Sequence, residues 1–339
     1  MVFLDYMSLP QKTAQSGITL LQMHAFNVGL MQCVNVLYAS TCTMTLLCTK
    51  SPEHCLDTRA AYLESGWPMF ECLISMLIKK SDMVIDLPRA LEWIREKWTR
   101  PDHPGAQCNE SLFWLREDNR RATRRPPVHP NEFSKRVKTY TFTNNSDSDF
   151  VDGKYRTTYG DIVGFTKKVD YEDIPLALGD DWKLFLHQVL RDCNFLVQVD
   201  LSNNEAIEGA TLEPFAEAAA GTLEWLDLSN CPGFEGSLKP LRSCRKLETL
   251  LLAGCVQLEG TVEPLAALPG LWKVNLECCF GLTGGILPLA GLEKLVALNV
   301  CDTALLLGEE GSSSSGRQQQ TAEDEPLARG VVSDRDEAG

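Results

Sequence analysis

The sequence lacks the patterns that several common classes of protein require. Lys and Arg total 32 against 46 Asp and Glu, a formal charge of −14, which argues against general binding to nucleic acid or anionic lipid. The five histidines show no metal-ligand spacing, and there is no phosphate-binding glycine loop, no Gly-x-Ser-x-Gly and no kinase signature. We therefore expect no metal site, no nucleic-acid partner and no resident cofactor.

The cysteines also lack the spacing of common metal and redox motifs. There are 13, an odd number, without a CxxC pair, and no signal-peptide pattern follows Met1. This usage favours free thiols in a reducing compartment. We expect the chain to be cytoplasmic.

An unbroken apolar run is missing too, although no residue from Thr13 to Thr49 is charged. A membrane span needs about 20 mostly apolar residues, and polar side chains such as Gln22 and Asn27 interrupt the best window here. Five apolar residues instead share one helical stripe: Met23, Phe26, Leu30, Val34 and Leu37. The pattern predicts a buried amphipathic helix that closes near Tyr38 and no membrane span.

What the sequence does contain is a repeat. The frame L-x-x-L-x-L-x-x-N/C begins at Leu223, Leu247, Leu271 and Leu295, a period of 24 residues, and an earlier copy begins 27 residues before, at Leu196. Each copy continues with a Gly and then a Pro followed by an apolar residue. The pattern resembles the leucine-rich repeat, and the Gly-x-apolar-x-Pro-Leu arm resembles that of plant-type repeats.

This resemblance implies a solenoid over residues 181–308, because one repeat cannot bury its apolar face alone. Strands are expected near 197–201, 224–228, 248–252, 272–276 and 296–300. The cysteines at the ninth frame position, Cys231, Cys255 and Cys279, are expected in the core. A helix over 182–193 should cap the first repeat, whereas only Leu305 to Leu307 remain to shield the last.

The third and fifth frame positions should point to the concave face of such a solenoid. Among them we expect these partner-binding residues: Gln198, Asp200, Trp225, Asp227, Lys273, Asn275 and Asn299. An exposed Trp225 beside Asp227 would anchor a protein partner. The alternative is a solvated face that carries one stray tryptophan.

The first 87 residues alternate strand-like and helix-like segments. Apolar runs at Val2–Leu4, Thr43–Cys48 and Met83–Ile85 predict strands, and a helix that opens at Pro68 should end at Lys79-Lys80, where cations suit the helix dipole. This alternation predicts a parallel α/β sheet.

The same region carries a second resemblance. Leu4-Asp5-x-x-Ser8-Leu9-Pro10-Gln11 and Tyr62-x-x-Ser65-x-Trp67-x-x-x-Glu71 resemble the fungal heterokaryon-incompatibility domain and the related Toll/interleukin-receptor (TIR) domain. The resemblance implies a flavodoxin-like module that is truncated, with its first strand before Met1. It also implies that Glu71 is the catalytic carboxylate of NAD cleavage. Alternatively, Glu71 is an acidic residue favoured by the helix dipole.

Residues 88–180 read as a helical extension and linker. Short helices are expected at 89–98, at 131–138 and from Ser146 to about Tyr159. A basic run from Arg116 to Arg125 is either a phosphate or nucleic-acid patch or a solvated linker; we favour the linker, because no aromatic platform accompanies it. Residues 309–339 form an acidic tail expected to be disordered.

Together these patterns predict an α/β chain: a partial TIR-like module (1–87), the extension (88–180), leucine-rich repeats with their capping helix (181–308) and the tail (309–339). The predicted function is protein interaction in intracellular signalling, through the concave face of the repeats. The alternative is an NAD-cleaving signalling enzyme that uses Glu71, with the repeats as its sensor.

Overall fold

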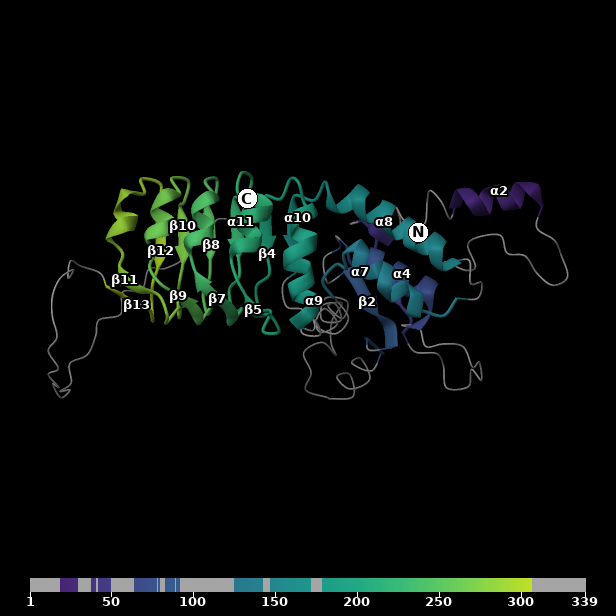
Figure 1. Ribbon diagram of the computed structural model, residues 1–339, viewed down its shortest axis with the longest axis horizontal. Coiled ribbons are helices and arrows are strands. Elements are labelled where there is room, and N and C mark those ends of the chain that lie inside the picture. Colours follow the sequence, from purple (N-terminus) through teal and green to yellow (C-terminus); the bar gives the residue numbers. More distant parts are fainter. Residues whose placement is uncertain are drawn as a thin grey trace, which may run out of the picture.

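A computed structural model describes residues 19–29, 38–40, 42–49, 64–77, 79, 83–88, 90–91, 125–142, 147–171 and 179–306 (Figure 1). The predicted strand Val2–Leu4, most of the helix predicted at 89–98, the arginines of the basic run before Arg125 and the tail from 309 lie outside these residues. The described elements form a mixed α/β structure with parallel sheets, in which the repeats occupy one end.

A six-stranded parallel sheet runs through the repeats. Its order is β12-β10-β8-β6-β4-β3. The strands are β3 (Lys168–Asp170), β4 (Gln198–Asp200), β6 (Trp225–Asp227), β8 (Thr249–Leu251), β10 (Lys273–Asn275) and β12 (Ala297–Asn299). Five of them lie within the predicted segments, which confirms the strand predictions. Equivalent frame positions pair with no slip, as when Leu226 pairs with Leu250 and Leu250 with Val274.

The second half of each repeat returns through a short strand and a turn of helix. The return strands are β5 (Glu208–Ala210), β7 (Gly233–Ser237), β9 (Gln257–Glu259), β11 (Thr283–Gly285) and β13 (Ala304–Leu306). The helical turns are α11 (Glu213–Ala219), η7 (Lys239–Ser243), η8 (Glu263–Ala267) and η9 (Leu287–Gly291). All four turns carry Pro at their first or second position, where a missing N–H costs no hydrogen bond.

The core between the two halves is built from the frame leucines and cysteines. Leu226, Leu250 and Leu252 are 0% exposed. The buried thiols of Cys231, Cys255 and Cys279 donate to main-chain carbonyls of the preceding copy at 2.9, 3.1 and 3.1 Å. Burial raises the pKa of the Cys231 and Cys279 thiols to about 12. The prediction that these cysteines are core residues is confirmed.

The eighth frame position is left-handed in every copy. Its φ angles are +61° at Asn203, +58° at Asn230, +77° at Gly254, +59° at Cys278 and +54° at Asp302. Asn, Asp and Gly tolerate this region with little strain, whereas a Cys does so less readily. The backbone turn that ends each strand therefore explains why four of the five copies carry Asn, Asp or Gly at this position.

The helix predicted before the first repeat is present as a continuous segment of three parts: α9 (Gly179–Leu184), the π-helical η6 (Phe185–Val189) and α10 (Leu190–Asp192). Trp182 and Phe185 are 0% exposed and share the core of the repeats. The indole N–H of Trp182 has no hydrogen-bond partner within the described part of the chain. Beyond β4, however, the sheet continues into β3, which the sequence interpretation did not identify.

Two further helices lie beside this segment in Figure 1: α7 (Pro130–Arg136), followed by η5 (Val137–Thr139), and α8 (Asp147–Val163). They confirm the helices predicted at 131–138 and from Ser146. Tyr155 in α8 is fully buried, stacks on Phe133 at a centroid distance of 4.0 Å and donates its hydroxyl proton to the Val128 carbonyl at 2.7 Å. These contacts tie α7 to α8.

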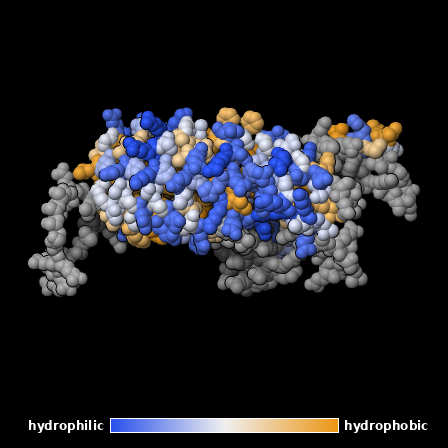
Figure 2. All heavy atoms as spheres, viewed as in Figure 1, coloured by the Kyte–Doolittle hydropathy of each residue, from blue (hydrophilic) through white to orange (hydrophobic). Residues whose placement is uncertain are grey.

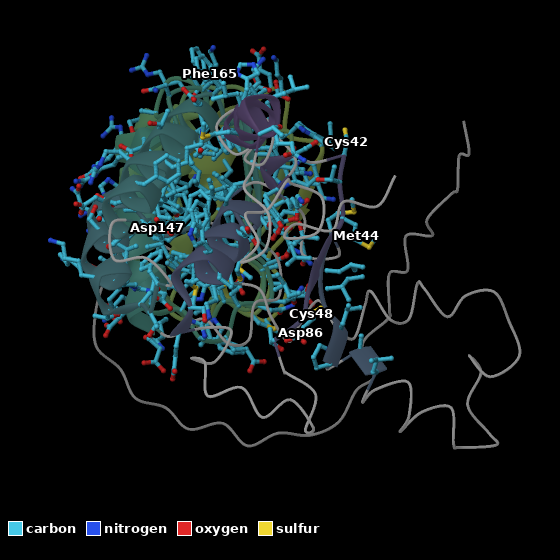
Figure 3. All side chains as sticks on the ribbon, turned by 90° about the vertical axis from the view of Figure 1, so that its right-hand side faces the viewer. Cys42, Met44, Cys48, Asp86, Asp147 and Phe165 are labelled. Carbon is cyan, nitrogen blue, oxygen red and sulfur yellow. The ribbon has the colours of Figure 1, made fainter. Side chains whose placement is uncertain are left out.

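The N-terminal strands β1 (Thr45–Leu47) and β2 (Val84–Asp86) are parallel, and α4 (Gly66–Ser75) lies between them in the chain. The predicted strand-helix-strand order is therefore present. Thr45 and Leu47 of β1 point to the interior, whereas Met44 and Cys48 are exposed (Figure 3).

Lys79 corrects one expectation about this unit. The sequence predicted that this helix would end at Lys79-Lys80, but α4 ends at Ser75 and Lys79 is 0% exposed. Its Nζ donates to the hydroxyls of Thr43 at 3.0 Å and Thr45 at 2.7 Å. Burial lowers the pKa of this lysine to about 8. The two hydroxyls accept hydrogen bonds from the ammonium group, which would otherwise be buried without these partners.

The helix α2 (Leu20–Val28) corrects another. The sequence predicted a buried amphipathic helix, but Leu20 is 81%, Leu21 79% and Met23 44% exposed. Helical periodicity identifies the face that a helix would bury if another element covered it, and Figure 1 shows α2 lying apart from the other described elements. No helix among the described residues is long and apolar enough to cross a membrane.

Candidate functional site

The face of the six-stranded sheet that points away from the core carries the residues predicted to bind a partner. We call this face, made by the third and fifth frame positions of the strands, the sheet face. The third positions form one column across β3 to β12: Lys168, Gln198, Trp225, Thr249, Lys273 and Ala297. Neighbouring strands lie about 4.8 Å apart, so the register brings these side chains together.

Trp225 is the largest side chain in this column and is 40% exposed. Its neighbour across the ladder, Thr249, is only 7% exposed although it too lies on the sheet face. A half-exposed indole between small and polar neighbours offers contact area that is already fixed in place by the strand.

The fifth positions form the second column: Asp170, Asp200, Asp227, Leu251, Asn275 and Asn299. These polar side chains also have a local structural role. Asp200, Asp227, Asn275 and Asn299 each accept the main-chain N–H two residues later, at 3.1, 2.9, 3.0 and 3.0 Å. Such Asx turns hold the chain as it leaves the strand. One side-chain oxygen of each of these four residues therefore stabilises the repeat, independently of any contact with a partner.

Three carboxylates occupy neighbouring rungs at one end of this column. Burial is the main cause that raises the pKa of Asp200, opposed by the hydrogen bonds from Ser202, while the charges of Asp227 and Asp170 raise it further. Lys168 lies 3.5 Å from a carboxylate oxygen of Asp170. This end of the sheet face is therefore strongly acidic.

One strand of the sheet face and one exposed aromatic residue of the repeats escaped the sequence interpretation. The strand is β3, whose Val169-Asp170-Tyr171 copies the Val-Asp-Leu of Val199 to Leu201 without the leucines that opened each recognised frame. The aromatic residue is Trp272, which is 44% exposed and immediately precedes β10 at the second frame position, outside the two columns of the sheet face. An aromatic residue beside Lys273 was the available signal.

A separate aromatic pair lies where β3 and β4 begin. Phe165 and Phe195 are 70% and 48% exposed, and their rings stack at a centroid distance of 6.1 Å with planes 10° apart. Figure 3 shows Phe165 at the edge of the molecule. On the side shown in Figure 2, hydrophilic residues cover most of the described surface and apolar ones gather in small groups.

Glu71 lies in α4, away from the sheet face, with a half-buried side chain. The same helix is tied to α8 by a hydrogen bond from the Trp67 indole N–H to Asp147 at 3.1 Å. The structure thus keeps Glu71 and the partner-binding residues apart, and its catalytic role stays a prediction.

A polar groove of about 530 Å³ lies between α7 and α10. It is lined by His129, Asn131, Glu132, Lys135, Gln188, Arg191 and Asp192. Both imidazole nitrogens of His129 are engaged: Nδ1 accepts the N–H of Asn131 at 3.1 Å, and Nε2 lies 3.4 Å from Asp192. Asp192 also accepts the hydroxyl of Tyr159 at 2.8 Å. The groove therefore presents a structural histidine rather than a free base, and the described residues hold no group of ligands suited to a metal ion.

Comparison with known proteins gives a limited result. No family model matches this sequence, and no curated protein matches it. A solved structure of an internalin C2 from Listeria monocytogenes is similar over 35% of this chain and 67% of that chain, with 21% sequence identity and a TM-score of 0.20. This likeness is distant and partial. The geometry of the chain itself is that of a mixed α/β protein with parallel sheets and leucine-rich-repeat-like units.

Proposed function

We propose that this chain is an intracellular interaction protein that binds a protein partner through the sheet face, as part of a signalling process. In this proposal the repeats of 181–308 form a solenoid and the sheet face is its concave surface. The observation that carries the proposal is Trp225, 40% exposed in the middle of a ladder whose pairing is regular on both sides. Exposed tryptophans are strongly favoured as interaction anchors.

The surroundings of Trp225 support the same proposal. Asp227 lies two residues further along the strand on the same face, and Lys273 lies in the same column two strands away. Charged residues around an aromatic anchor select a partner and speed its encounter more than they add affinity. We therefore assign Trp225 the main energetic role and assign orientation to Gln198, Asp200, Asp227, Lys273, Asn275 and Asn299.

We place this activity in the cytoplasm, in keeping with the free cysteines. The cysteines described are free, including the neighbours Cys278 and Cys279. A reducing compartment keeps such thiols unpaired.

Site-specific photo-crosslinking tests the proposal. A photoreactive phenylalanine analogue at position 225, which keeps an aromatic ring in place of the indole, should capture one defined polypeptide in cells that express the chain, and Asp227→Lys in the same protein should abolish that capture. The matched control is the same probe at Phe280, an aromatic residue that is 57% exposed and lies outside the two columns. Equal capture from positions 225 and 280 would contradict the proposal.

A second candidate function is NAD cleavage by Glu71. The observation in its favour is the parallel β1–α4–β2 order, which places Glu71 on the helix between two parallel strands, as the TIR resemblance requires. Purified protein incubated with NAD should then release nicotinamide, and Glu71→Ala should stop the release. Release that equals the Glu71→Ala background would eliminate this function.

A further inference from the structure

Two carboxylates of the sheet face lie beside the exposed ring of Trp225. Gln198 and Trp225 pair across β4 and β6, and Trp225 is 40% exposed. Asp200 and Asp227 pair in the same way, two residues further along these strands. Paired residues of neighbouring strands lie about 4.8 Å apart, and residues two apart along one strand about 6.6 Å. One side chain of a partner can therefore touch the indole and both carboxylates at once.

These two carboxylates have no cation of their own within the described part of the chain. Lys168 lies 3.5 Å from Asp170, on the neighbouring strand, and no described Lys, Arg or His forms an ion pair with Asp200 or Asp227. Both side chains are half-buried, so water screens their mutual repulsion less than it would at an exposed site. A cation placed between them would relieve this repulsion.

The turn that follows each strand does not explain the negative charge. The Asx turn needs one side-chain oxygen, which Asn275 and Asn299 supply at the same frame position at 3.0 and 3.0 Å. Asp227 makes the equivalent bond through Oδ1 at 2.9 Å, and among the described residues no hydrogen bond engages its Oδ2. An amide would therefore hold the turn equally well. The charge is in excess of what the fold uses, at the two rungs that flank Trp225.

We propose, building on the proposed function, that the partner presents an arginine to this part of the sheet face. Its guanidinium group stacks on the indole of Trp225 and donates hydrogen bonds to Asp200 and Asp227. A guanidinium is planar, so it can lie against an aromatic ring while its N–H groups reach two carboxylates. A lysine ammonium is a compact, strongly hydrated charge that cannot make both contacts with the same geometry. The partner is thus a protein segment selected for arginine.

Peptide display on the purified full chain tests this proposal. The probes are random linear peptides, and only those whose capture is lost in Trp225→Ala are retained. These peptides should be enriched in arginine. In the strongest of them, replacing the arginine by citrulline, which keeps the planar shape without the charge, should weaken binding at least about tenfold. Replacement by lysine should also weaken binding, by at least about threefold, because the forked contact is lost.

Variants of the chain locate the contact. Asp200→Asn and Asp227→Asn remove one charge each and keep the oxygen that the Asx turn uses, so both should remain folded by circular dichroism. Each should weaken the arginine peptide about tenfold and leave the affinity of the citrulline peptide unchanged, as expected for two groups that interact directly. Glu259→Gln is the matched control. It removes the same charge from an exposed side chain of β9 and should leave both affinities unchanged.

Two results would overturn this proposal and leave the proposed function intact. The first is a set of peptides that depends on Trp225 without enrichment of arginine. The second is a loss from arginine to citrulline that is equal in the wild type, Asp200→Asn and Asp227→Asn, which would place the arginine elsewhere. A library that yields no peptide dependent on Trp225 would instead contradict both proposals.

The basic run from Arg116 to Arg125 provides the remaining test, because it could supply an arginine from the same chain. Replacing the arginines of this run by glutamine should leave the affinity for the arginine peptide unchanged. A rise in affinity would show that this segment competes for the sheet face, and the assignment of the arginine to a separate partner would then be wrong.

Discussion

At the scale of single residues, the frame leucines carry the stability of the repeats. Leu250 is 0% exposed between Leu226 and Val274. We predict that Leu250→Ala lowers the free energy of unfolding by about 2–5 kcal/mol, because it leaves a cavity that packed neighbours cannot fill. Leu21→Ala, at a side chain 79% exposed, is the control and should cost less than about 0.5 kcal/mol. Urea unfolding measures both, and similar costs would contradict the assigned core.

Cys278 offers a test in the opposite direction. It occupies the left-handed eighth position, where Asn203 and Asn230 stand in other copies. We predict that Cys278→Asn raises the free energy of unfolding by up to about 1 kcal/mol, because Asn accepts this conformation with less strain. Gly254→Asn is the matched control: a Cβ there would lie 2.9 Å from the side-chain oxygen of Asn230, so no gain is expected. A loss at position 278 would show that the turn is not strained.

His129 predicts a dependence of stability on pH. Burial, chiefly, and Arg156 lower the pKa of the imidazole, although Asp192 acts to raise it. Its Nδ1 must remain unprotonated to accept the N–H of Asn131 at the start of α7. Because the folded pKa lies below the unfolded one, the unfolded state takes up the proton first as the pH falls. The contribution of neutral His129 to the free energy of unfolding is therefore complete at pH values above 6.5, the ordinary histidine pKa, and declines as the pH falls below that value.

The comparison with His129→Asn isolates this effect, since Asn is a good cap that does not titrate. Denaturant unfolding at pH 7.5 and 5.5 should show a larger loss for the wild type than for the variant. Equal losses would mean that His129 does not couple protonation to folding.

At the scale of elements, the thiol ladder joins one copy of the repeat to the next. The thiols of Cys231, Cys255 and Cys279 are buried and bonded to carbonyls of the preceding copy. We predict that they alkylate slowly in the native protein and rapidly in denaturant, because burial suppresses the reactive thiolate. Exposed Cys301 is the internal control and should react rapidly in both conditions. Mass spectrometry after timed labelling resolves the sites, and fast native labelling of the ladder would contradict its placement.

The elements that could be predicted from the sequence are those with a strong internal pattern. The leucines at Leu223, Leu247 and Leu271 place the strands because their period is regular, whereas β3 was missed because Thr166 replaces the opening leucine. The burial of Lys79 and the exposure of Met23 could not be predicted, because each depends on which element covers it rather than on local spacing.

The candidate site was predictable to a similar extent. Strand alternation was enough to place Trp225 and Asp227 on one face. The Asx turns of Asp227 and Asn275 depend on the backbone after each strand, which the frame alone does not specify. Trp272 was missed because it lies immediately before β10, at the second frame position, whereas the sequence interpretation considered the third and fifth positions.

At the scale of the whole molecule, most of the buried residues in the described ranges form one core cluster, from Met69 in α4 through Tyr155 in α8 to Leu289 in the repeats. A smaller second cluster comes from β1, the α4 segment and β2. Figure 1 shows the six-stranded sheet extending away from the β1–α4–β2 unit. The division at 87/88 and 180/181 therefore stays a proposal about function: one end carries Glu71 and the other the sheet face. If the protein binds its partner through the sheet face, the affinity should depend on the residues of the sheet face and not on Glu71.

The most direct test measures binding of the captured partner to purified variants. Trp225→Ala and Asp227→Lys should each weaken the affinity at least about tenfold, a loss of ~1.4 kcal/mol or more, because they remove the anchor and reverse its neighbouring charge. Glu71→Ala should bind like the wild type, since its side chain lies in α4. Isothermal titration calorimetry measures the affinity of each variant, and circular dichroism checks that each variant is folded. Full affinity in the two sheet-face variants, or a loss confined to Glu71→Ala, would contradict the assignment of function to the sheet face.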